Sequence, residues 1–173
     1  MSIPSESERL RFRAFRESDI PWLEEVFRDP HARRFFPRMQ EAGAGRTFIE
    51  RQLRRYAEHG HGLWALERKE DGAPVGDCGL TYQRAGEGEL LEVGYHVTAE
   101  HRRKGYATEA ATACREHAFE KLGTDFLVSI VDPANEASRT VAGRIHRDMR
   151  WFERDGVALC LYFTTREVWK GER

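Results

Sequence analysis

The stretch HRRKGYATEA, residues 101–110, decides the fold. Three consecutive basic residues precede Gly105, and the small residues that follow it are typical of the first turn of a helix. The segment before it, GELLEVGYHV (residues 88–97), is predicted as a strand. The stretch is therefore a turn that joins the end of a strand to the start of a helix.

This position gives the turn a physical role. Gly105 adopts backbone angles that other residues resist, and the amides of a first helical turn have no partner inside the helix. The helix dipole adds about half a positive charge at that point, and Arg102, Arg103 and Lys104 add more. These features predict a cradle for a diphosphate. The alternative is an ordinary solvated turn, which a basic cluster beside a glycine more often forms.

Length and composition limit the other possibilities. The 173 residues suit a single domain, residues 1–173, and the 28 basic and 29 acidic residues leave a formal charge of -1. We therefore expect no nucleic-acid or membrane partner. The cysteines, Cys78, Cys114 and Cys160, are odd in number and far apart, which argues against a disulfide framework or a zinc site. We expect a cytoplasmic protein without a metal centre.

The flanking sequence predicts the remaining elements. Residues 8–15 alternate as a half-buried strand does, and two helices follow, one ended by Asp29-Pro30 and one with Leu53 on its apolar stripe. The segment between these helices, HARRFFPRMQ, is predicted to be irregular. LWALERK, PVGDCGLTYQR and GELLEVGYHV then form an antiparallel meander, with a turn at residues 86–88 before the last of them.

After the basic turn the pattern changes to a helix over residues 107–122, the apolar strand DFLVSIVD, a helix in ANEASRTVAGRIH, and a hairpin made by MRWFER and ALCLYFTTREVW. A strand, helix and strand in succession imply a right-handed crossover and one parallel strand pair. The predicted order is β-α-α-β-β-β-α-β-α-β-β. The fold class is α+β, a mixed and mostly antiparallel sheet with helices on both faces.

The sequence resembles the GNAT superfamily of N-acetyltransferases, which bind acetyl-CoA at a turn of the form R/Q-x-x-G-x-G/A. Here Arg102, Gly105 and Ala107 carry that pattern. The order of SERLRFRAFRESD, PVGDCGL, EVGYHVTAEHRRKGYATEA, VDPANEASRTVAGRI and LYFTTREVW resembles the RimJ/RimL-like branch, which acetylates the N-termini of ribosomal proteins. One departure is RIHRD, where residues 146–148 replace a glycine and an aromatic or methionine.

The resemblance implies a site for acetyl-CoA. Its pyrophosphate is expected on the amides of residues 103–108, and its pantetheine arm beside the strand over residues 90–97, which requires the parallel strand pair to splay apart. The predicted cofactor-binding residues are His96, Val97, Arg102, Arg103, Lys104, Gly105, Tyr106, Ala107, Thr108, Asn135 and Ser138.

Acetyl transfer needs a proton acceptor, an oxyanion donor and a proton for the departing thiolate. Glu92 is the candidate base, since an acid between Leu91 and Val93 sits in an apolar setting; the alternative is an ion pair with an arginine of a neighbouring strand. A backbone N–H near His96 or Val97 would bind the oxyanion. By resemblance Ser138 protonates the thiolate, with a helix-capping role and Tyr162 as the alternatives.

The acceptor is the least defined part. The aromatic residues that would wall its cleft are Phe35, Phe36, Trp64 and Tyr82, although core packing explains aromatic residues more often. We expect a protein or peptide N-terminal α-amine or a small primary amine. A non-catalytic CoA-binding sensor and an acetyltransferase for an antibiotic or polyamine stay open, as does a homodimer.

Overall fold

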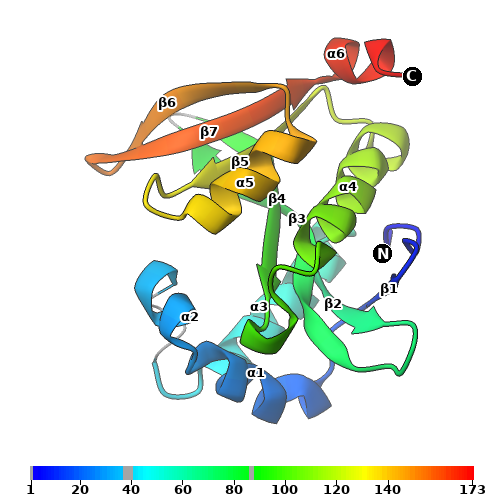
Figure 1. Ribbon diagram of the computed structural model, residues 1–173, viewed down its shortest axis with the longest axis vertical. Coiled ribbons are helices and arrows are strands. Elements are labelled where there is room, and N and C mark those ends of the chain that lie inside the picture. The colour runs from blue at the N-terminus through cyan, green and yellow to red at the C-terminus, as the bar shows by residue number, and fades with distance from the viewer. Residues whose placement is uncertain (1, 37–40, 86–87) are drawn as a thin grey trace.

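The computed structural model describes residues 2–36, 41–85 and 88–173. Its strands form one seven-stranded sheet in the order β1-β2-β3-β4-β5-β7-β6 (Figure 1). The strands are β1 Leu10–Arg13, β2 Leu63–Arg68, β3 Pro74–Ala85, β4 Gly88–Val97, β5 Phe126–Val131, β6 Asp148–Arg154 and β7 Val157–Thr165. The predicted meander and the closing hairpin are confirmed.

The helices are α1 Ile20–Phe27, α2 Pro30–Phe35, α3 Ala44–His59, α4 Tyr106–His117, α5 Glu136–Ile145 and α6 Arg166–Gly171, with 3-10 turns at Glu17–Asp19 and Ala99–His101 and a π turn at Ala118–Leu122. In Figure 1, α4 and α5 diverge, and β4 is visible between them. Within the described residues, no helix has the length and apolar character needed to cross a bilayer.

All neighbouring strands are antiparallel except β4 and β5. The parallel pair records one facing residue pair, Glu92 opposite Val128, whereas β3 and β4 face each other along their whole overlap. β4 therefore separates from β5 beyond Glu92, toward Val97. The predicted mixed sheet with a splayed parallel pair is confirmed.

Helices cover both faces of the sheet, as predicted. The side chains of β2 show this, since they alternate between the two faces. Trp64 and Leu66 enter a core shared with α4, and Ala65 enters a second core formed with α1 and α3. The three cysteines are free and buried, and the Sγ atoms of Cys78 and Cys114 lie 3.5 Å apart in the first core.

The structure corrects the prediction of an irregular segment after α1. α1 ends just before Asp29, as predicted, but Asp29 also begins α2. Its Oδ2 accepts hydrogen bonds from the backbone N–H groups of His31, at 3.0 Å, and Ala32, at 3.1 Å. Pro30 supplies the first-turn proline that such helices favour. Residues 37–40 of the predicted segment, and residues 86–87 of the predicted turn, lie outside the described residues.

Two further predictions are wrong in detail. Leu53 is 44% exposed, and the buried position on α3 belongs to Gln52, whose Oε1 accepts from the backbone N–H of Leu63. The last residues of the predicted hairpin form α6 instead of strand, because Thr165 caps a helix there and Trp169 stacks on Phe119 in the core.

Gly76 sets the separation between β3 and the end of β4. It adopts a φ of 155°, and a Cβ at this position would lie 2.0 Å from the carbonyl oxygen of His96. A side chain there is incompatible with the observed approach of the two backbones. Gly76 therefore fixes the position of the last residues of β4.

We expect Gly76→Ala to lower the free energy of unfolding by about 1–3 kcal/mol, because the two strands must move apart. Gly171→Ala is the matched control, since nothing lies within 4 Å of a Cβ at that position; it should change stability by less than about 1 kcal/mol. Urea denaturation of both variants measures the difference. Equal stabilities would show that the strands tolerate the side chain.

Candidate functional site

A cavity of about 730 Å³ lies beside the end of β4 and is bordered by α2, α4 and α5. Half of the residues that line it are predicted cofactor-binding residues, although they come from distant parts of the chain. The predicted cofactor-binding residues that line it are His96, Val97, Arg102, Arg103, Gly105, Tyr106, Ala107, Thr108, Asn135 and Ser138. Lys104, Glu92 and Tyr162 are not among the lining residues.

The turn before α4 opens on this cavity. Gly105 is the N-cap residue of α4 with a φ of 84°, and no side chain within the described residues caps the helix. Arg103 has a φ of 60°, which is rare outside glycine and shows how tightly the chain turns. The amides of the first turn of α4 are therefore available to an anion in the cavity.

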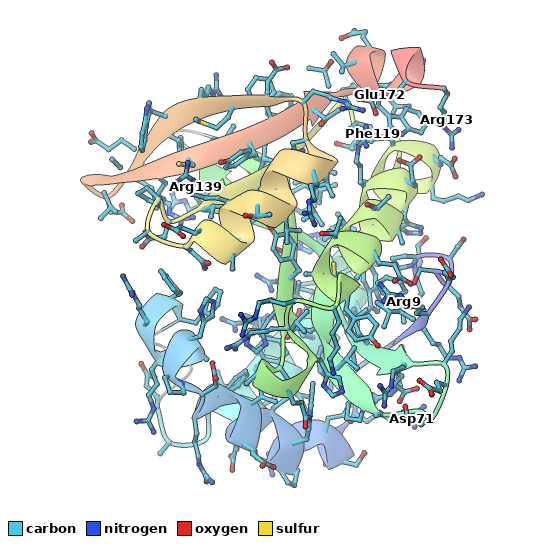
Figure 2. The ribbon with its side chains drawn as sticks, in the orientation of Figure 1. Arg9, Asp71, Phe119, Arg139, Glu172 and Arg173 are labelled. Atoms are coloured by element: carbon cyan, nitrogen blue, oxygen red, sulfur yellow. The ribbon has the colours of Figure 1, made fainter. Side chains whose placement is uncertain are left out.

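Arg9, which directly precedes β1 and is labelled in Figure 2, stabilises this turn. Its Nη1 donates to the carbonyl oxygen of Lys104 at 3.0 Å, and its Nε donates to Glu109 Oε2 at 2.7 Å. Glu109 also accepts from the hydroxyl of Ser7 at 2.6 Å. Burial opposes ionisation of Glu109, but the hydrogen bonds from Ser7 and Arg9 outweigh it and hold its pKa below the usual value. Sequence patterns did not predict this long-range contact.

Arg102 lines the cavity, but its guanidinium already has partners. It forms an ion pair with Asp29, with 2.7 Å between Nη2 and Oδ2, and its Nε donates to the carbonyl oxygen of Val97 at 3.0 Å. The three basic side chains therefore do not surround one point as the sequence suggested. Arg102 instead ties the cap of α2 to the end of β4.

Ser138 sits in the first turn of α5, where the side chain of Asn135 accepts from its backbone N–H at 3.1 Å. The Ser138 hydroxyl donates to the hydroxyl of Tyr95 at 3.2 Å, and the Tyr95 hydroxyl donates to the carbonyl oxygen of Ser138 at 2.8 Å. Burial raises the pKa of Tyr95, so its hydroxyl stays protonated. Tyr95 also lines the cavity, and the sequence analysis missed it.

Glu92 lies at the point where β4 and β5 separate. Its Oε1 accepts from the backbone N–H of Ile130 at 3.0 Å, and within the described residues it forms no ion pair with an arginine. Burial raises its pKa to about 7, against the opposing effects of the Ile130 N–H and of Arg154 and Arg55. A carboxyl group with this pKa can exchange a proton near neutral pH.

The remaining predicted residues are dispersed. The hydroxyl of Tyr162 accepts from Nε of Arg139, which is labelled in Figure 2, at 3.4 Å. Of the four aromatic candidates, Phe36 lines the cavity. Phe35 packs against His31 and is not among the lining residues, Trp64 is fully buried in the core, and Tyr82 packs against histidines outside the cavity. Among the described residues, no cluster of three or more histidine, cysteine or acidic side chains has the arrangement of a metal site.

Residues 9–146 match the family model of the acetyltransferase (GNAT) domain. The chain belongs to the GNAT family of acetyltransferases. This confirms the superfamily predicted from the basic turn, the acyltransferase activity and acetyl-CoA as the acyl donor.

Individual GNAT proteins resemble the chain over most of its length. It is 29% identical over 140 residues to the uncharacterised protein YkkB of Bacillus subtilis (strain 168). The aligned region covers 80% of this chain and 81% of the relative. An acetyltransferase from Agrobacterium tumefaciens str. C58 superposes with a TM-score of 0.80 at 27% identity, covering 93% of each chain. RimL, a ribosomal L7/L12 alpha-N-protein acetyltransferase in complex with coenzyme A, shares the fold at a TM-score of 0.77 and 16% identity, covering 94% of this chain and 97% of that one.

Residues 146–148, where the sequence departs from the RimJ/RimL-like pattern, do not disturb the GNAT fold. His146 is buried, and its ring lies 3.1 Å from Ser129 Oγ and 3.2 Å from Thr164 Oγ1, which joins the end of α5 to β5 and β7. Burial lowers the pKa of His146 to about 3, so the ring is neutral. At this departure from the pattern, His146 therefore forms a polar contact between the end of α5 and the sheet.

The pKa of Glu92 predicts a stability that depends on pH. In the unfolded GNAT chain the carboxyl ionises near 4.5, and in the folded chain near 7. The contribution of Glu92 to the free energy of unfolding is fully present below about pH 4.5. It falls by up to about 3 kcal/mol as the pH rises through 7, because the folded state resists ionisation of this carboxyl group. Glu92→Gln removes this loss.

We therefore expect the stability of Glu92→Gln to increase relative to the unsubstituted protein between about pH 5 and 8. Urea denaturation of both proteins across that range measures it. A constant difference between the two proteins would contradict the raised pKa.

Proposed function

We propose that this acetyltransferase transfers acetyl from acetyl-CoA directly to a primary amine, with a protein or peptide N-terminal α-amine as the first candidate acceptor. The observation that carries the proposal is the uncapped N-terminus of α4, which opens at Gly105 on a cavity that continues along the separated edge of β4. A single domain, residues 1–173, provides the whole site.

The donor would lie across the described wall of the cavity. Its pyrophosphate accepts hydrogen bonds from the amides of residues 103–108, where the helix dipole and Arg103 add positive charge. Its pantetheine arm pairs with the edge of β4 that β5 leaves unpaired beyond Glu92. This places the thioester near Ser138 and Asn135, in the first turn of α5.

The reaction then needs proton transfers at both ends of the thioester. Glu92, with its pKa of about 7, receives a proton of the acceptor amine through a water, since it does not line the cavity. A backbone N–H near His96 or Val97 binds the oxyanion. Ser138, held by Tyr95, protonates the departing thiolate, with Tyr162 as the alternative donor.

The acceptor class rests on the shared fold and on the shape of the cavity. RimL acts on the α-amine of a ribosomal protein, and a cavity that reaches α2 on the far side of β4 gives a peptide terminus room to enter. A small amine such as an antibiotic or polyamine is the second candidate. A homodimer would suit the edge strand β6, which exposes Met149 and Trp151.

Gly105→Val tests the donor site. A β-branched residue at a φ of 84° costs about 1–3 kcal/mol, and its Cβ would approach Arg9 Nη2 at 3.3 Å. We expect the Kd for acetyl-CoA, measured by calorimetry, to rise at least about tenfold. Gly123→Val is the matched control, because Gly123 has a φ of 71° at the opposite end of the same helical segment. It should lose stability but keep the affinity, and equal losses of affinity would refute the assignment.

A panel of acceptors tests the reaction. We expect release of free CoA thiol with short peptides that carry a free α-amine, and none with the same peptides blocked by N-acetylation, because only a free amine is nucleophilic. Spermidine and aminoglycosides form the second arm. Thiol release with that arm alone would replace the peptide terminus with a small-molecule acceptor, and silence in both arms would overturn the proposal.

A further inference from the structure

His96 is a buried histidine on the cavity wall without a hydrogen-bond partner. The residue is 7% exposed, and its two ring nitrogens are buried and bond to none of the described residues. Leaving a buried polar group unsatisfied costs about 1–3 kcal/mol. Since His96 lines the cavity, a ligand in that cavity can supply the missing partner.

The surroundings of His96 suit proton transfer. Its Nδ1 lies 3.6 Å from Oδ2 of Asp77, which faces it from β3 and is 4% exposed. A small rotation of the ring would form a hydrogen bond to this carboxylate and leave Nε2 as the free acceptor. Phe36 packs edge-on against the imidazole, with 6.1 Å between ring centroids.

The other charged or titratable groups near His96 have defined states. His31 of α2 lines the same cavity, and burial together with the charge of Arg102 lowers its pKa. Arg102, from the turn after β4, is paired with Asp29. Asp77 is therefore the acidic group nearest the imidazole, and the nearby cation is already neutralised.

His96 also lies on the side of β4 from which an acceptor must come. Tyr95 and Val97 belong to the core on the α4 side, where Tyr95 bonds to Ser138 of α5. Because strand side chains alternate, His96 faces the opposite side, toward Phe36 of the α2 segment. The cavity touches all three residues, so it wraps around the free edge of β4 and joins the two faces of the sheet.

We propose that His96 contacts the acceptor amine and takes its proton, while Asp77 orients the imidazole and stabilises its charged form. This inference rests on the proposed acetyl transfer. The neutral Nε2 removes one proton from the ammonium group, the amine nitrogen forms the C–N bond, and the C–S bond breaks. The second proton of the amine passes through a water to Glu92 as the amide forms, and Ser138 protonates the thiolate to give free CoA. The imidazolium and Glu92 then release their protons to solvent, from which Ser138 regains one.

The assignment separates His96 from Glu92. Four residues along a strand span about 13 Å, so the two side chains do not hold the same amine directly. Direct contact belongs to His96, which lines the cavity, and any contribution of Glu92 is relayed through water.

The test compares variants on the best acceptor from the peptide and amine panel. We expect His96→Gln to lower kcat/KM for the acceptor by about 10²–10⁴-fold and to remove the ascending limb of its pH profile. Asp77→Asn should lower kcat/KM and shift that limb, and free imidazole should restore part of the activity of His96→Ala. The Kd for acetyl-CoA, measured by calorimetry, should stay unchanged, which also shows that the variants fold.

His117→Gln is the control for loss of a buried histidine, because His117 bonds to Ser2 at the far end of α4. It should keep the full kcat/KM. Activity retained in His96→Gln, or a pH limb lost in Glu92→Gln and kept in His96→Gln, would overturn the role of His96 while the proposed function stands. Absence of CoA release by the unsubstituted protein with every acceptor would overturn both.

Discussion

The hydrogen bonds of Arg9 hold the turn on which the donor site depends. A chain that passes through left-handed backbone angles at Arg103 and Gly105 has little local stabilisation. Arg9, just before the first strand, supplies it by bonding both to the carbonyl oxygen of Lys104 and to Glu109, one turn into α4. The first-turn amides of α4 are left without a side-chain cap among the described residues. A residue distant in sequence therefore maintains the proposed anion site.

A second constraint is the separation of β4 from β5. The backbone N–H of Ile130 bonds to the side chain of Glu92 at the point of separation, so it is satisfied without another strand. Beyond that point β4 has a free edge, and the cavity extends around it to both faces of the sheet. Donor and acceptor can then meet from opposite sides of one strand, between Ser138 on one side and His96 on the other.

Local patterns predicted the strands, the glycine turn and half of the residues that line the cavity, because alternation, helix caps and glycine positions are properties of neighbouring residues. Long-range contacts were not predictable in this way. Asp29 looked like a helix stop, and its capping of α2 became visible only in three dimensions. Tyr95 was missed because its contact with Ser138 joins residues far apart in the sequence. The significance of His96 depends on Asp77, which another strand brings opposite to it.

Asp29 connects structural elements on the two sides of β4. The same carboxylate caps α2, which borders the acceptor side, and pairs with Arg102, which follows the strand on the donor side. In the proposed arrangement, a single connected unit therefore borders both substrates. Substitutions that aim to change the acceptor preference, such as those at Phe36, must therefore keep the carboxylate of Asp29. Its removal would also disorder the side of the cavity where the thioester is proposed to bind.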